Sequence, residues 1–189
     1  SMQAFFVNAI AEGAKFSVNY ENNVYNSLRK ENQKRSKSFN SDNKFNVLKI
    51  QINSSTSNDR LYLLEHENTT DKFDNGYDAE KIFDNTNGPQ IYATTPFGHA
   101  SICTNTSFDG QEIGFIANSE NEIYTMTFDI ENLHSYEELY IYDTETKTHI
   151  DIVAEESYQF YASTTPNNKR FQITSTRLEA PQGPTTAIE

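Results

Sequence analysis

Tryptophan is absent from the sequence, and cysteine occurs once in 189 residues. Because a lone Cys103 cannot form an intramolecular disulfide, the fold must be stabilised by its core, and a chain of this length buries roughly two-thirds of the surface that its unfolded form exposes. Cys103 lies in the alternating segment GHASICTN, which predicts a small buried side chain rather than a reactive thiol. A disulfide scaffold is therefore excluded.

Long apolar runs are also missing, and basic residues are scarce. No run approaches the roughly 18 apolar residues of a membrane helix, and no positively charged apolar leader is present, so we expect no membrane insertion. Fifteen Lys and Arg against 27 Asp and Glu give a net charge of −12, which argues against nucleic acid as a partner. The one basic stretch, residues 29–44, predicts a solvated loop, with a docking patch for a polyanion as the alternative.

Sequence motifs of catalysis are absent as well. The chain has no Gly-x-Ser-x-Gly elbow, phosphate-binding loop or dinucleotide fingerprint. His66 has no second histidine four residues away, as a zinc-binding helix requires, and the other histidines, at positions 99, 134 and 149, are scattered. We therefore expect no catalytic residues and no enzyme activity. A hydrolase with two facing carboxylates is kept only as a hypothesis to be tested.

Aromatic and small polar residues dominate what is present, with 13 Phe and 11 Tyr. Strand signals recur along the whole chain, and turn residues separate them. The segments are QAFFVNA, AKFSVNY, FNVLKIQIN, DRLYLLEH, QIYATT, GHASICTN, EIGFIAN, EIYTMTFD, ELYIYDT, KTHIDIV, SYQFYAS and KRFQITS. In FNVLKIQIN, for example, alternation places Leu48, Ile50 and Ile52 on one face of the strand.

About twelve short strands predict an all-β fold. Most connections are too short for parallel crossovers, so we expect a two-sheet antiparallel β-sandwich of the jelly-roll or immunoglobulin-like type. It would occupy residues 1–175 as a single domain, and the Pro, Gly and Thr content of residues 176–189 predicts a C-terminal linker. Helical turns are expected only at residues 78–83 and 22–30.

The acidic segment FDNGYDAEKIFDN, residues 73–85, has two interpretations. In the first, it is a structural crossover in which Asp74 and Asp78 cap backbone N–H groups and start a helical turn. In the second, Asp74, Asp78 and Asp84 are calcium ligands, since hard cations bind several carboxylate oxygens, although the spacing departs from that of an EF-hand. We favour the crossover and keep calcium as the alternative; no other cofactor is expected.

Tyrosines are the remaining candidates for ligand-binding residues. Sugars stack on flat aromatic rings beside amide and carboxylate groups, and these residue types are abundant here. Tyr140 and Tyr142 share one face of their predicted strand, and Tyr92 and Tyr161 lie in or beside others. If these rings point outward they form a ligand-binding platform for a glycan; if they point inward they pack in the core.

Several motifs, taken in order, resemble the C-terminal β-sandwich module of large surface proteins secreted by Bacteroidetes bacteria. The opening strand of that family is matched by Gln3, Phe5, Phe6 and Val7. Its middle signature is matched by Asp74, Tyr77, Asp78, Ala79 and Lys81. Its late series is matched by Asp143, Tyr158, Phe160, Arg170 and Phe171, although Ile141 stands where Leu or another aliphatic residue is usual. The resemblance extends from about residue 3 to about residue 175.

The resemblance implies a function and a location. Such modules often precede a type IX secretion sorting domain, and TTAIE at positions 185–189 is similar to the usual lead into that signal. It implies an extracellular or outer cell-surface location and a non-catalytic accessory role as a spacer or assembly domain, with neighbouring domains of the parent protein as partners. The alternative is a carbohydrate-binding or adhesion module, supported by calcium, whose partner is a glycan or a host or matrix protein.

Overall fold

The computed structural model describes residues 12, 13, 15, 45–83, 88–132 and 136–177. The chain divides into two units, Ser1–Asn40 and Ser41–Glu189, and only three residues of the first unit are described. Outside the described residues lie the predicted strand QAFFVNA, the predicted strand AKFSVNY except for Lys15, the basic stretch, the helical turn at 22–30 and nearly all of the predicted linker. The extent of a single domain over residues 1–175 therefore stays a prediction.

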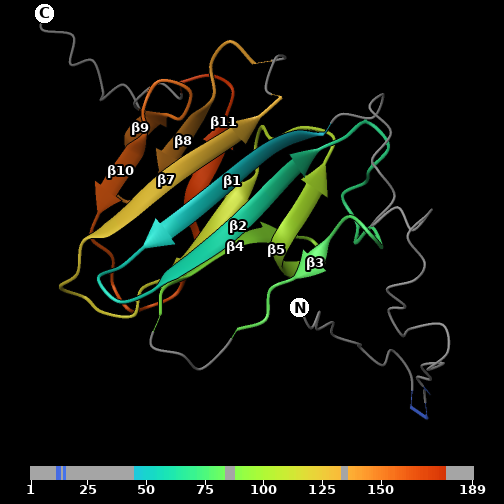
Figure 1. Ribbon diagram of the computed structural model, residues 1–189, viewed down its shortest axis with the longest axis horizontal. Coiled ribbons are helices and arrows are strands. Elements are labelled where there is room, and N and C mark those ends of the chain that lie inside the picture. Colours follow the sequence, from blue (N-terminus) through green and yellow to red (C-terminus); the bar gives the residue numbers. More distant parts are fainter. Residues whose placement is uncertain (1–11, 14, 16–44, 84–87, 133–135, 178–189) are drawn as a thin grey trace, which may run out of the picture. The chain divides into compact units, whose positions relative to one another are not determined.

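The described part of the second unit is all-β and contains no helix (Figure 1). Its strands are β1 (Asn46–Asn53), β2 (Asn58–Glu65), β3 (Ala79–Glu80), β4 (Gln90–Thr95), β5 (Gly98–Asn105), β6 (Glu112–Ile116), β7 (Tyr124–Glu131), β8 (Tyr140–Asp143), β9 (Thr148–Asp151), β10 (Ser157–Phe160) and β11 (Asn167–Thr174). Every strand predicted from residue 45 onward is found. The helical turn predicted at 78–83 is wrong, because Ala79 and Glu80 pair with β5 instead.

The strands form one continuous hydrogen-bonded sheet in the order β10-β7-β1-β2-β5-β4-β6-β11-β8-β9, with β3 attached to β5. Every pairing is antiparallel except that of β2 with β5, which is parallel. The expectation of a purely antiparallel fold is therefore wrong at this point. A parallel pair needs a long crossover, and residues 66–97, which contain the acidic segment, β3 and β4, supply it; those of them that the structure describes form no helix.

Alternation along the strands creates the core. Leu48, Ile50 and Ile52 of β1 are fully buried, as predicted, while Lys49 and Gln51 between them are only partly buried. Complete burial of an aliphatic side chain contributes about 1.5–3 kcal/mol, so this one strand face supplies a substantial part of the stability. The core is thus built by period-2 patterning rather than by any single contact.

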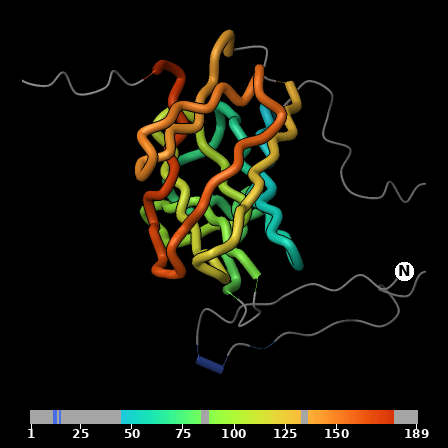
Figure 2. Tube along the Cα trace, turned by 90° about the vertical axis from the view of Figure 1, so that its left-hand side faces the viewer, coloured from blue at the N-terminus to red at the C-terminus, as the bar shows by residue number. Residues whose placement is uncertain are grey.

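The sheet curls until strands far apart in its hydrogen-bonded order face each other. The ring centroids of Phe115 in β6 and Tyr124 in β7 lie 5.1 Å apart, and those of Phe160 in β10 and Phe171 in β11 also lie 5.1 Å apart. Figure 1 looks onto β7 and β1 with β11 behind them, and Figure 2 shows the strands enclosing one interior. The result is nearly barrel-shaped.

Candidate ligand groove

An open groove of about 770 Å³ lies at one end of the sheet. It is lined by the end of β1 and the turn after it, the connection between β6 and β7, and the end of β10. The lining residues are Asn53, Ser54, Ser55, Ser119, Asn121, Glu122, Ile123, Thr125, Gln159 and Tyr161. Two of them expose apolar surface, Tyr161 at 62% and Ile123 at 47%. The groove therefore combines an aromatic ring with amides, hydroxyls and one carboxylate.

One hydrogen bond joins the two loops that line the groove, and others order the connection between β6 and β7. The Glu122 carboxylate accepts a bond of 2.5 Å from the Ser55 backbone N–H and one of 3.3 Å from Asn118 Nδ2. These bonds, with that from Ser55 the larger influence, lower the pKa of Glu122 below its usual range. The buried Tyr124 hydroxyl accepts from the Ser119 N–H at 2.9 Å and lies 3.0 Å from Asn118 Oδ1. The connection between β6 and β7 is therefore ordered by its own hydrogen bonds and is joined to the turn after β1.

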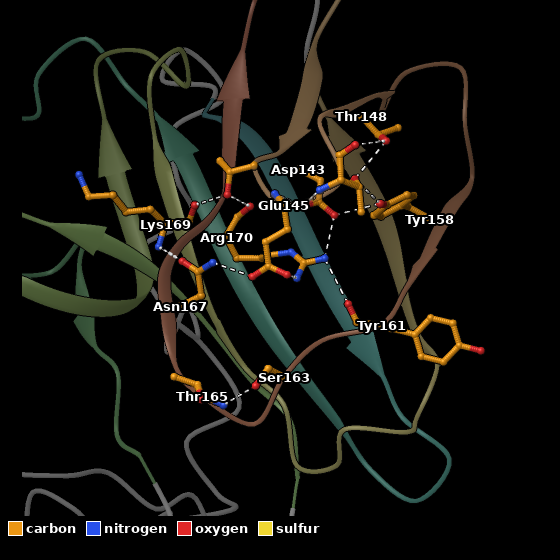
Figure 3. Close-up of polar contacts among 12 residues, drawn as sticks. Asp143, Glu145, Thr148, Tyr158, Tyr161, Ser163, Thr165, Asn167, Lys169 and Arg170 are labelled. Atoms are coloured by element: carbon orange, nitrogen blue, oxygen red, sulfur yellow. Dashed lines mark hydrogen bonds and ion pairs between the residues drawn. The ribbon is translucent and has the colours of Figure 1, made fainter.

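Tyr161 follows β10, and its backbone is held from inside the protein (Figure 3). Arg170 Nη2 donates a hydrogen bond of 3.2 Å to the Tyr161 carbonyl oxygen. The guanidinium is only 1% exposed, whereas the Tyr161 ring projects away from it toward solvent. Strand alternation explains this direction, because Phe160, the preceding residue, points into the core. A fixed backbone therefore carries an exposed ring.

The guanidinium belongs to a buried network that joins β8, β10 and β11. Arg170 Nη2 lies 2.9 Å from Asp143 Oδ2, and Nη1 pairs with Glu145. The same carboxylate oxygen of Asp143 accepts a hydrogen bond of 2.9 Å from the Tyr158 hydroxyl. Burial raises the pKa of Tyr158, and a hydrogen bond with Thr146 opposes this shift without cancelling it. A buried carboxylate is stable only when it is paired. Asp143 has three kinds of partner: the Arg170 guanidinium, the Tyr158 hydroxyl and the Glu145 backbone N–H.

Two aromatic rings complete this network. The Arg170 guanidinium carbon lies 5.2 Å from the centroid of the Phe160 ring and 5.3 Å from that of the Phe171 ring. The five residues of the late motif series, Asp143, Tyr158, Phe160, Arg170 and Phe171, thus form one contact cluster. Their role in this fold is to fasten the strands together, and the motif did not itself indicate a groove.

Tyr92, one of the predicted ligand-binding residues, is 1% exposed. It lies on the outer side of β4, where its ring packs against Phe83 and His99 at centroid distances of 5.2 and 4.5 Å. Its hydroxyl donates to Asn168 Oδ1 at 2.6 Å. A Cβ atom on Gly114 of the neighbouring strand would meet the Tyr92 ring at 2.2 Å, so the bare glycine makes room for it. This ring is used for packing.

Tyr140 and Tyr142 do share the outer face of β8, opposite the fully buried Ile141. Tyr140 is nevertheless only 3% exposed, because Arg177 covers it with its guanidinium carbon 5.2 Å from the ring centroid. Tyr142 is partly buried and packs against His149 at 4.6 Å. Burial, and secondarily Arg177, lower the pKa of His149. Of the four predicted tyrosines, only Tyr161 lines the groove, so they do not form one platform.

The acidic segment is held by its own carboxylates. Asp74 accepts a bond of 2.7 Å from the Thr70 N–H, and Asp78 accepts 2.8 and 2.7 Å bonds from the N–H groups of Asp74 and Thr104. These are bonds to backbone N–H groups, as the crossover interpretation predicts, but they fasten a turn to β5 instead of starting a helix. Asp84 lies outside the described residues.

Calcium binding by this segment stays a prediction. Within the described ranges, no group of three or more His, Cys, Asp or Glu side chains is placed to hold a metal ion. The Asp78 carboxylate already uses both oxygens on N–H groups, Oδ2 toward Asp74 and Oδ1 toward Thr104. Binding of a cation there would have to compete with these hydrogen bonds.

A second, smaller hollow of about 370 Å³ lies beside the connection between β5 and β6. The Gln111 side chain is part of its lining; its Oε1 accepts a hydrogen bond of 2.7 Å from Asn105 Nδ2, and its Nε2 donates one of 3.1 Å to the Thr94 carbonyl oxygen. Cys103 packs beneath it, and burial raises the pKa of its thiol to about 12. The thiol is therefore protonated at neutral pH, which fits the predicted packing role.

Sequence reasoning missed most of the groove. Of its lining residues only Tyr161 was a candidate. The others are brought together by the pairing of strands that are distant in sequence, such as the pairing of Asn53 with Thr125.

Comparison of the chain with models of protein families, with curated proteins and with solved structures found no match. The part of the chain that the structure describes has no helix with the length and apolar character of a membrane span.

Proposed function

We propose that this chain is a non-catalytic accessory module of a larger exported bacterial surface protein, acting as a spacer or assembly domain outside the cell. The observation that carries the proposal is the structural use of its acids. Asp59 binds Lys81 and the Ile91 N–H, Asp78 binds two backbone N–H groups, and Asp143 binds Arg170. Carboxylates used in this way stabilise the fold and are not presented to a substrate. The location rests on the sequence resemblance.

The proposed architecture is a two-layer β-sandwich of the jelly-roll or immunoglobulin-like type, in which the sheet folds over so that β7 and β10 face β6 and β11. The aromatic contacts between β6 and β7 and between β10 and β11 support it. A sandwich closed by buried rings and a buried ion pair resists deformation, which is what a spacer between domains requires.

The test is an activity screen of the purified chain on polysaccharides and peptides, with the Glu122→Gln variant in parallel. The described residues that line the groove include one carboxylate, whereas glycoside hydrolysis needs two facing each other. We expect no turnover from either protein. Turnover that is abolished by Glu122→Gln would show that the module is an enzyme.

A carbohydrate-binding or adhesion module is the second candidate function, and the exposed Tyr161 ring in the groove favours it. Exposed aromatic rings beside amides are typical of sugar-binding sites. The test is a screen of the chain against glycans and matrix proteins, in calcium and in chelator. Saturable binding that free sugar competes away would support it, and a blank screen with folded protein would leave the spacer function alone.

A further inference from the structure

The groove offers two kinds of surface that a sugar ring requires. Tyr161 supplies a flat ring that is mostly exposed, and Ile123 extends the apolar surface. Asn121 supplies an amide that, among the described residues, makes no side-chain hydrogen bond. Gln159 Nε2 and Asn53 Nδ2 each make one long bond of 3.5 Å, to Thr125 Oγ1 and the Thr125 carbonyl oxygen. Bonds of this length are weak, so these amides can exchange them for ligand hydroxyls.

Charge narrows the class of ligand. Among the described residues that line the groove, Glu122 alone is charged at neutral pH. Its hydrogen bonds from Ser55 and Asn118 favour the ionised form and hold it in place. The chain as a whole also carries a net charge of −12. A uronic acid, a sialic acid or a sulfated sugar would be repelled, whereas an uncharged ring would not.

We propose that the groove is a binding subsite for an uncharged pyranose ring of a glycan chain, with Tyr161 as the stacking surface and the amides of Asn121 and Gln159 as hydrogen-bonding groups. The proposal rests on the second candidate function and adds to it the ligand class and the residues.

The Arg170 network makes Tyr161 suitable for this role. Because the Tyr161 carbonyl is bonded to a buried guanidinium, the backbone that carries the ring is already ordered before a ligand arrives. Binding then costs less conformational entropy, which is the principle of preorganisation.

The absence of tryptophan allows a direct test. The variant Tyr161→Trp contains one tryptophan, so its indole fluorescence comes from the groove alone. Tryptophan also preserves the aromatic stacking surface. We would titrate it with uncharged hexasaccharides of glucose, xylose, mannose and N-acetylglucosamine, and with hexagalacturonate of the same length. We expect a saturable shift of indole emission with at least one neutral probe, and binding of hexagalacturonate about tenfold weaker or undetectable, a difference that corresponds to one step of 1.4 kcal/mol.

Calorimetry on three further variants separates the roles. Tyr161→Phe should bind within a few-fold of the parent, and Tyr161→Ala should bind about tenfold more weakly, because the ring face is lost. Val153→Ala removes an apolar side chain of similar exposure outside the groove and should bind as the parent does. Unfolding curves of all variants show whether each is folded.

The outcomes are distinguishable. Glycan binding that Tyr161→Ala leaves unchanged would overturn the assigned site while the second candidate function stands. Tighter binding of hexagalacturonate than of every neutral probe would overturn the ligand class. A blank with all neutral probes would overturn both the site and the carbohydrate-binding function.

Discussion

Arg170 Nη2 donates a hydrogen bond of 3.2 Å to the carbonyl oxygen of Tyr161, so a fully buried cation holds the backbone of the residue with the most exposed tyrosine ring in the described structure. The same guanidinium nitrogen lies 2.9 Å from Asp143. The contacts that join β8, β10 and β11 therefore also fix the backbone that carries the exposed Tyr161 ring. Changes to the network should affect the stability of the fold and the order of this backbone.

The Arg170–Asp143 pair should show strong energetic coupling. Removing one partner leaves the other buried and unpaired, so Arg170→Met and Asp143→Asn should each cost about 3–5 kcal/mol of unfolding free energy. The double variant should cost less than the sum by about 1–3 kcal/mol, because no unpaired charge remains. Urea unfolding of the parent and the three variants measures this cycle.

Lys169→Met is the matched control for that cycle. Lys169 is the adjacent residue and pairs with Glu112 at 2.8 Å, but its side chain is mostly exposed. An exposed ion pair contributes about 0–1 kcal/mol, so this variant should unfold nearly as the parent does. Simple additivity of the two buried substitutions would contradict the role that we assign to the pair.

Phe160 should be a major source of stability. Its ring is buried and contacts the rings of Phe115 and Phe171 at 5.2 and 5.1 Å. Phe160→Ala should cost about 3–5 kcal/mol, since it leaves a cavity between the facing strands. Tyr161→Ala, one position further, should cost under about 1 kcal/mol by the same chemical denaturation, because its ring is exposed. Equal losses would show that the two strand faces are assigned incorrectly.

Asp78 should stabilise the turn of the acidic segment without metal. Asp78→Ala deprives the N–H groups of Asp74 and Thr104 of their acceptor, and we expect a loss of about 1–3 kcal/mol that is the same in calcium and in chelator. Thermal unfolding in both buffers measures it, and the exposed Glu80→Ala is the control. A loss that occurs only in calcium would instead support the metal interpretation.

Glu122 should make the groove loops sensitive to acid. Its folded-state pKa is lowered, chiefly by the hydrogen bond from Ser55, so its contribution to stability is complete above its unfolded pKa of about 4.3 and is lost as pH falls through the folded value. The parent should therefore lose more stability than Glu122→Gln between about pH 6 and pH 3. Urea unfolding at several pH values tests this, with the exposed Glu155→Gln as control. Identical pH profiles for the parent and Glu122→Gln would contradict it.

Local patterning predicted much of the fold. The alternation of β1 correctly placed Leu48, Ile50 and Ile52 inside, and the all-β class followed from the recurrence of such segments. The parallel pairing of β2 with β5 could not be predicted in this way, because it depends on how residues 66–97 cross between two strands distant in sequence. Period-2 patterning specifies the face of a strand but not its neighbour.

The candidate site was less accessible to sequence reasoning for the same reason. Strand alternation places the Tyr92 side chain on the outer face of β4, yet Phe83 and His99 from other segments cover its ring. Tyr161 is exposed because nothing comparable covers it in the described structure. Burial of an outward aromatic ring is decided by tertiary contacts, so the residue pattern alone did not separate these two tyrosines.

The most direct test of the groove as the surface that meets a ligand is a two-dimensional ¹⁵N NMR titration of the chain with the neutral hexasaccharide that binds best. The side-chain amides of Asn121 and Gln159 and the backbone amides of Glu122 and Tyr161 should shift together with one dissociation constant, while those of Tyr92 and Tyr140 stay in place. Shifts centred on Tyr92 or Tyr140, or no shifts at any sugar concentration, would contradict the account.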